Sequence, residues 1–192
     1  VTDRWCAYNW WPLEWRQLCW SHIKRHWEAM IEAGGKTAEI GKKLQEQRTR
    51  LFELWGRVRD GTLKRSTFRR YVAPIRAQIR DLLAQGSTCP HAKSAGMCSE
   101  LLKVEEALYT FVRVEGVEPT NNSAERAIRP GVIWRNLCFG THSRWGSRFV
   151  GRILTVVQTL KQQKRDALAF VTVCVDARRR GLQTASLLPT AQ

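Results

Sequence analysis

Apolar residues recur at helical spacing along most of the chain, and this pattern predicts a mainly α protein with one or two short strands. Near the start, residues 16–20 are a candidate strand. A helix over about 21–33 is predicted to stop at the Gly34-Gly35 pair. Two longer helical segments follow, and Asp60-Gly61 marks the turn between them. These two segments are expected to form an antiparallel helical hairpin.

Both arms of this hairpin carry apolar residues three or four positions apart. In the first arm these residues are Leu44, Leu51, Leu54, Trp55 and Val58. In the second arm they are Phe68, Val72, Ile75, Ile79 and Leu82. Ser66 is a candidate N-cap of the second arm and Gly86 a stop signal. Pro74 is predicted to kink or interrupt it, because proline removes a backbone hydrogen bond.

The second half of the chain alternates between loops and helices. Three segments are assigned from composition and spacing: a loop over 87–97, a helix over 100–112 and a turn over 115–119. A short helix over 122–129 is predicted to end at Pro130-Gly131, and residues 132–139 are predicted to be extended. An amphipathic helix follows, with its apolar face made by Phe149, Ile153, Val156, Val157 and Leu160. Asp166 is a candidate N-cap for a last helix that runs toward Gly181.

The net positive charge of the chain indicates which kinds of partner it can bind. Its 192 residues include 32 Lys and Arg against 17 Asp and Glu, a formal charge of +15, and 43% of them are hydrophobic. A folded protein with this charge attracts nucleic acid or an anionic membrane surface. No apolar run approaches the ~20 residues of a membrane-spanning helix, and the N-terminus does not resemble a signal peptide. We therefore expect a cytoplasmic, nucleic-acid-associated protein without a membrane partner.

The six cysteines do not form a recognisable framework. Their spacings do not repeat, and the nearest approach to paired zinc ligands is Cys89-Pro90-His91 with Cys98 further on. Free thiols are the default prediction.

Basic residues are distributed unevenly along the chain. Residues 42–80 contain 12 basic and 3 acidic side chains, and residues 126–165 contain 9 basic and none acidic. The second stretch follows Glu125 directly, so a carboxylate is followed by unopposed positive charge. This arrangement suits a site where a metal ion meets a nucleic-acid phosphate. The alternative interpretation of either stretch is a solvated, arginine-rich helix face.

Asp3 and Glu125 are candidate ligands for the metal ions of such a site. Phosphodiester cleavage and strand transfer commonly use two Mg²⁺ ions about 4 Å apart. These hard cations prefer carboxylate oxygens. Spacing alone does not identify the two residues.

A resemblance to a known family identifies them. Residues 118–130, Glu-Pro-Thr-Asn-Asn-Ser-Ala-Glu-Arg-Ala-Ile-Arg-Pro, closely resemble the signature of the insertion sequence 66 family of bacterial transposases. The similarity continues through Trp134-Arg135, Phe139-Gly140-Thr141, Ser143 and Gly146. Upstream, the sequence is similar to the family's second-aspartate region at Thr2-Asp3-Arg4-Trp5, at Tyr8-Asn9, and at residues 16–22 with Arg25. Leu187-Leu188-Pro189 resembles the close of its C-terminal element, so the resemblance covers nearly the whole chain.

The resemblance implies a ribonuclease-H-like (DDE transposase) α/β fold, of which this chain is the C-terminal part. It implies a partial catalytic domain over residues 1–150 and the family's C-terminal element over residues 151–192. Within the first of these, it implies a helical insertion at about 36–112 and the glutamate motif at 118–130.

Carried over by motif, Asp3 matches the second catalytic aspartate and Glu125 the catalytic glutamate, both as Mg²⁺ ligands. The first aspartate has no counterpart, because only Val1 and Thr2 precede Asp3. The chain is therefore expected to be inactive by itself. The duller interpretation of Glu125 is a capping box with Asn122. The non-catalytic interpretation of Asp3 is an ordinary aspartate on the protein surface.

Residues near the motif are candidates for contact with DNA. The basic ones are Arg126, Arg129, Arg135, Arg144 and Arg148. Candidate supporting residues are His22, Asn121 and Asn122. His22 either positions a phosphate or water, or is a structural histidine. Most of the nine Trp residues are expected in the core, while one or two exposed ones are candidates to stack on unpaired bases.

The function that the resemblance implies is DNA transposition. The chain is expected to bind DNA and, when complete, to catalyse Mg²⁺-dependent strand cleavage and transfer. Its expected partners are DNA, further copies of itself on DNA, and accessory proteins of the same element. One alternative is a non-catalytic DNA-binding or oligomerisation module left after truncation. Another is a structural nucleic-acid-binding protein of ribosomal type.

Overall fold

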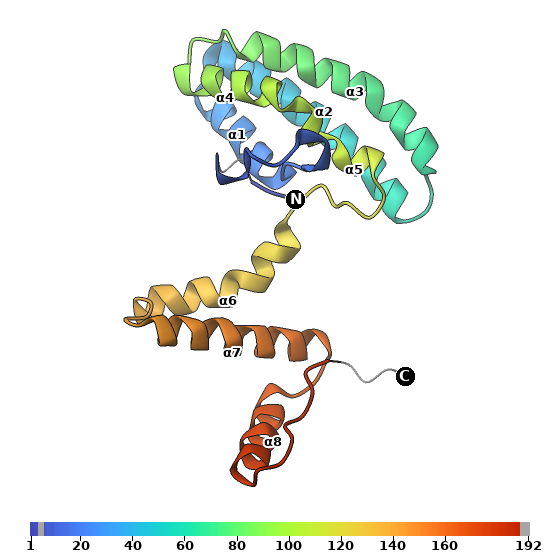
Figure 1. Ribbon diagram of the computed structural model, residues 1–192. Helices are drawn as coiled ribbons and strands as arrows, with labels where there is room; N and C mark the ends of the chain where they lie inside the picture. The colour runs from blue at the N-terminus through green and yellow to red at the C-terminus, as the bar shows by residue number, and fades with distance from the viewer. Residues whose placement is uncertain (4–5, 189–192) are drawn as a thin grey trace. The chain divides into compact units, whose positions relative to one another are not determined.

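The computed structural model describes residues 1–3 and 6–188 of the chain and is built mainly of helices (Figure 1). Its backbone divides into two compact units, Val1–Asn122 and Ser123–Gln192, and each is described by itself. Arg4, Trp5 and Pro189, which take part in the family resemblance, lie outside the described residues. The assignment of domains at 1–150 and 151–192 rests on the resemblance and stays a prediction.

The first unit consists of helices connected by short turns. In chain order they are η1 (Cys6–Tyr8), η2 (Leu13–Trp15), α1 (Trp20–Glu32), α2 (Gly35–Arg59), α3 (Arg65–Gly86), α4 (Ala92–Lys103), η3 (Glu105–Leu108) and α5 (Thr110–Arg113). The helices α2 and α3 pack along each other, so the predicted helical hairpin is confirmed. The interruption predicted at Pro74 is wrong, because α3 runs through it. Pro74 and Arg70, whose carbonyl loses its partner, are both exposed, so water can satisfy that oxygen.

The start of α3 also differs from the prediction. The helix begins at Arg65, with Lys64 at the cap position, so Ser66 lies inside the first turn and is not the N-cap. The preceding turn is closed by the Asp60 carboxylate, which accepts hydrogen bonds from the backbone nitrogen and the hydroxyl of Thr62 at 2.9 and 2.7 Å. This turn fixes where the second arm starts.

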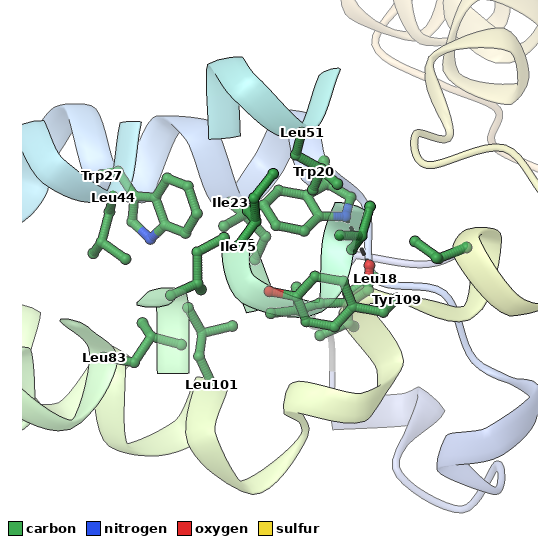
Figure 2. Close-up of a cluster of buried hydrophobic side chains, with 14 of the residues drawn as sticks. Leu18, Trp20, Ile23, Trp27, Leu44, Leu51, Ile75, Leu83, Leu101 and Tyr109 are labelled. Carbon is green, nitrogen blue, oxygen red and sulfur yellow. Dashed lines mark hydrogen bonds between the residues drawn. The ribbon is translucent and has the colours of Figure 1, made fainter. Parts of the chain in front are cut away.

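Aromatic rings lie among aliphatic side chains in the interior of the first unit (Figure 2). Trp20 is fully buried, and its ring centroid lies 5.7 Å from that of Trp27, 6.0 Å from that of Phe52 and 5.8 Å from that of Tyr109. All three pairs meet edge to face, the arrangement that ring quadrupoles favour. The Trp20 indole nitrogen donates to the carbonyl of Leu108 at 2.8 Å. The core therefore joins α1 and α2 to the segment after α4.

The predicted strand at 16–20 is reduced to one isolated parallel bridge between Thr2 and Leu18, and α1 begins at Trp20. A mainly α chain is confirmed. The ribonuclease-H-like sheet stays a prediction, since the described residues contain this bridge and no longer strand.

The region 87–112 differs from its predicted outline. The predicted loop ends early, because α4 begins at Ala92 and buries Met97, Cys98 and Leu101. The helix predicted over 100–112 is instead divided into the end of α4, η3 and α5. Gln17, which is buried, explains the break: its amide donates to the Leu108 carbonyl at 3.1 Å and accepts from the Phe111 backbone nitrogen at 2.8 Å. The Gln17 side chain thus takes the place of backbone partners that these two groups would have in a continuous helix.

Up to residue 188, the second unit is built of α6 (Asn122–Cys138), α7 (Arg144–Gln162) and α8 (Ala167–Arg179), the first of which begins at the unit boundary. The stop predicted at Pro130-Gly131 and the extended segment predicted over 132–139 are wrong, since α6 continues to Cys138. Its ribbon changes direction midway, as expected for a helix with an interior proline (Figure 1). The Asp166 cap is confirmed, because its carboxylate accepts from the Ala169 backbone nitrogen at 2.9 Å.

Candidate nucleic-acid interface

Part of the positive charge of the first unit is used internally. Arg76 donates to both carboxylate oxygens of the buried Glu105, at 2.8 and 2.7 Å. This hydrogen bond to Glu105 raises the pKa of the Arg76 guanidinium. Arg65 and Arg69 bind backbone carbonyls at the end of α5, including those of Phe111 at 2.7 Å and Arg113 at 2.6 Å. These three arginines hold the fold together and are not free to bind phosphate.

Asp3, His22 and Asn121 belong to one corner of the first unit, around the start of α1. Thr2, next to Asp3, donates its backbone nitrogen to the Gln17 carbonyl at 2.8 Å and accepts from the Cys19 backbone nitrogen at 2.8 Å. From the other end of the unit, the Asn121 backbone nitrogen donates to the Cys19 sulfur at 3.4 Å. Asp3, His22 and Asn121 are all half-buried.

Glu125 belongs to the second unit and lies half-buried in the first turn of α6. A carboxylate near the start of a helix is stabilised by the backbone dipoles there. Among its neighbours, Arg126 is exposed and reaches the Ser123 hydroxyl at 3.4 Å, and Arg129 is exposed. Asn122 is the first residue of α6 and the last of the first unit. The roles assigned to Asp3 and Glu125 by the resemblance stay predictions.

The remaining candidate arginines lie exposed around α6 and α7. Arg135 is in the last turn of α6, and Arg144 and Arg148 are in the first two turns of α7. Among the described residues, none of these three guanidinium groups has a hydrogen bond or ion pair. Two motif residues define the start of α7: the Ser143 hydroxyl accepts from the Gly146 backbone nitrogen at 3.0 Å. The motif thus positions arginines that have no partner among the residues that the structure describes.

A groove of about 790 Å³ lies between α6 and α7 and was not found from the sequence. Its lining includes Trp134, Arg135, Phe139, Val150 and Leu154. Gly131 lines the same groove, and a β-carbon there would lie 2.9 Å from Cδ1 of Leu154. Because the prediction treated residues 132–139 as extended, it could not place these side chains on one helix face.

A complete metal centre is not found in the part of the chain that is described. Asp3 and Glu125 offer the oxygen ligands that a hard divalent ion prefers. However, no three His, Cys, Asp or Glu residues come together there as a metal-binding group. The described side chains therefore do not fit a two-metal site by themselves. None of the described helices is long and apolar enough to cross a bilayer.

Comparisons with known proteins agree with the family resemblance. A family profile described as "Transposase IS66 family" matches residues 1–148. An uncharacterized protein, y4qI, of Sinorhizobium fredii (strain NBRC 101917 / NGR234) is 25% identical over 161 residues, which are 80% of this chain. The chain spans only 29% of the length of that relative. No solved structure matches the chain.

Proposed function

Because the chain belongs to the IS66 transposase family, we propose that it acts in DNA transposition and binds the DNA of a mobile element through its second unit. The main support for this proposal is the net positive charge of the second unit. Residues 123–192 contain 12 Lys and Arg against 3 Asp and Glu, which leaves +9. Arg129, Arg135, Arg144 and Arg148 are exposed there, and their guanidinium groups bind no described side chain. Unpaired arginines on a basic surface suit phosphate groups.

We further propose that Asp3 and Glu125 supply two of the carboxylates that hold divalent metal ions, with Mg²⁺ as the expected ion. The family match includes both residues, and both side chains are half-buried. A divalent ion in such a site would stabilise negative charge on a phosphate under attack. The described residues do not complete the site, so we derive no catalytic step from it.

Binding to duplex DNA at increasing salt tests the proposed interface. The logarithm of the affinity should fall linearly with the logarithm of the salt concentration, by roughly 0.9 per phosphate contacted. The double variant Arg144→Gln/Arg148→Gln should reduce this slope by about 2. Arg80→Gln is the matched control, since Arg80 is an exposed arginine of the first unit. A slope that responds equally to both changes, or no response to salt, would overturn the proposal.

Self-association is a second candidate function, and the exposed apolar side chains of the second unit favour it. The residues concerned are Ile128, Val132, Ile133, Leu137, Leu168, Val173, Val175 and Leu182. Exposed apolar side chains in this number favour contact with a partner where they adjoin one another. The charge of +9 opposes contact between copies until a polyanion neutralises it. Sedimentation of the chain with and without duplex DNA distinguishes the two functions: a DNA-independent oligomer favours self-association.

A further inference from the structure

The tip of the α6–α7 pair exposes aromatic rings among arginines. We define the hairpin tip as residues 137–149, the end of α6, the connecting loop and the first turns of α7. Phe139 is 90% exposed, Trp145 74% and Phe149 52%. Such large apolar areas in water are costly at about 25 cal/mol per Å². Their concentration in thirteen residues of a strongly basic unit requires a physical reason.

Two of these rings are stacked on each other in nearly parallel planes. Trp145 and Phe149 are four residues apart on α7, and their rings stack with centroids 5.7 Å apart and planes 10° apart. Arg144 precedes Trp145 and Arg148 precedes Phe149, so two exposed arginines occupy the neighbouring positions of the same helix turns. Side chains four residues apart lie on one helix face, about 6 Å apart along the axis. The surface therefore presents aromatic faces and positive charge side by side.

The connection between the helices holds the third ring in an unfavourable backbone conformation. Phe139 has a φ of 56°, and Gly140 follows with a φ of 86°. A left-handed conformation is ordinary for glycine but costs a bulky residue roughly 1 kcal/mol or more. Phe139 gains little burial in return, since its side chain is almost fully exposed. Backbone strain that packing does not offset clusters at sites that bind a ligand.

Charge decides which ligand suits this surface. From Arg126 to Arg165 the sequence has no acidic residue. An apolar protein partner would bury guanidinium groups without counter-charges, which is costly. A chain of nucleotides provides both features, because its phosphates neutralise arginines and its bases have flat faces for stacking. In an intact duplex those faces are covered by neighbouring base pairs, so only unpaired nucleotides can use the rings.

We propose that the hairpin tip is a stacking platform for unpaired nucleotides, formed by Phe139, Trp145 and Phe149 with Arg144 and Arg148. The proposal rests on the proposed binding of DNA and adds the state of the DNA that this surface recognises: single-stranded ends, gaps or bases displaced from a duplex. Duplex binding uses the arginines, Arg144 and Arg148 included, and does not require the three aromatic rings.

The test compares binding of the full chain to a single-stranded oligonucleotide and to a duplex of the same length, by fluorescence anisotropy. Trp145→Ala should weaken single-strand binding roughly 5- to 150-fold, the range measured for loss of one stacked base. Duplex binding should change less than about 2-fold. Trp15→Ala is the matched control, because Trp15 is 72% exposed and lies in the first unit. It should leave both affinities unchanged.

A second variant separates loss of the ring from loss of structure. Phe139→Gly removes the strain at φ 56°, so the thermal stability should stay equal or rise, while single-strand affinity should still fall. A fluorescent base analogue in the single strand should lose its stacking signal with Trp145→Ala and keep it with Trp145→Phe.

Three results would overturn the platform. Unchanged single-strand affinity in Trp145→Ala and Phe139→Gly would remove the aromatic role, and equal losses for single strand and duplex would show that only charge matters. Disruption by Trp145→Ala of an oligomer formed without DNA would assign the surface to a second copy. If the wild-type chain binds no DNA of either form, the failure lies with the proposed function itself.

Discussion

Gly41 of α2 lies directly against Met30 of α1, and a β-carbon at Gly41 would be 2.9 Å from the Met30 β-carbon. It would also lie 3.0 Å from the backbone oxygen of Trp27. Real β-carbons do not approach other atoms this closely, and neither neighbour is the flexible end of a side chain. The absence of a side chain at Gly41 therefore sets how closely the first two long helices of the first unit approach each other.

Gly41→Ala should accordingly destabilise the first unit. Overpacking a well-filled interior typically costs about 1–3 kcal/mol. Gly56→Ala provides a matched control in the same helix, since a β-carbon there would meet no atom within 4 Å. It should stabilise by roughly 0.4–1 kcal/mol through the unfolded state. Urea denaturation followed by circular dichroism measures both, and equal effects of the two changes would contradict the close approach.

Replacing Gln17 by methionine should also destabilise the first unit. The change keeps the approximate size of the side chain but leaves the Phe111 backbone nitrogen without its acceptor. A buried, unsatisfied polar group costs about 1–3 kcal/mol. Gln85→Met, at an exposed position of α3, is the control and should change stability by less than about 0.5 kcal/mol. Thermal melting of the two variants checks the difference.

Alkaline pH should destabilise the protein through Tyr109. Burial, assisted by the charge of Glu105, raises the pKa of the Tyr109 hydroxyl. The folded state therefore holds the proton more tightly than the unfolded state, whose tyrosine pKa is about 10. The resulting stability is complete below about pH 10 and is lost as the pH rises further.

Tyr109→Phe should remove this pH dependence. The buried hydroxyl has no hydrogen-bond partner among the described residues, so the change should be neutral or mildly stabilising at pH 7. Tyr71→Phe is the control, because Tyr71 is exposed. Unfolding midpoints between pH 7 and pH 11 measure the effect. A steeper loss of stability in Tyr109→Phe than in the wild type would show that another group titrates.

The chain as described should not cut DNA by itself. Two-metal catalysis requires ligands that fix both ions, and the described residues hold no group of three potential ligands. A nicking assay on supercoiled DNA with Mg²⁺ or Mn²⁺ should show only background for the chain and for Glu125→Gln. Metal-dependent nicking that disappears in the variant would mean that Glu14 or a second subunit completes the site.

Glu125→Gln should have its effect in an active, full-length transposase that carries the same motif. The substitution keeps the shape of the side chain but removes an anionic ligand. Strand cleavage should be abolished, while the affinity for DNA should change by less than about 2-fold. Cleavage at the wild-type rate would restrict Glu125 to stabilising the start of α6.

Local pattern was sufficient to predict the long helices. The spacing of Phe68, Val72 and Ile75 identified α3, and Asp166 was recognised as a cap, because both signals lie within a few residues. The continuation of α6 past Pro130 was missed. Breaker rules describe local preference, whereas Gly131 lies against Leu154 of α7, a contact that the sequence does not reveal.

The candidate interface was predicted in part for the same reason. The unopposed charge after Glu125 is a property of sequence, and the exposed Arg144 and Arg148 agree with it. The internal use of Arg65, Arg69 and Arg76 could not be predicted, because their partners lie 29 to 49 residues away. Exposed Trp residues were named as candidates for stacking on bases, but the sequence did not identify which ones, and Trp145 is one of the exposed ones. The stacked rings and the strained backbone are three-dimensional features.

The near absence of buried apolar side chains in the second unit bears on how binding would be measured. Of its described residues, Leu160 and Ala177 are the buried hydrophobic ones. Helices with so small a core open at little cost, so backbone amides of α6–α8 should exchange with solvent deuterium much faster than those of α1–α3. A nucleic acid that covers the exposed rings would slow this exchange and give the association a negative heat-capacity change. Calorimetry at several temperatures would therefore register ordering of the second unit that a structure of the free chain does not display.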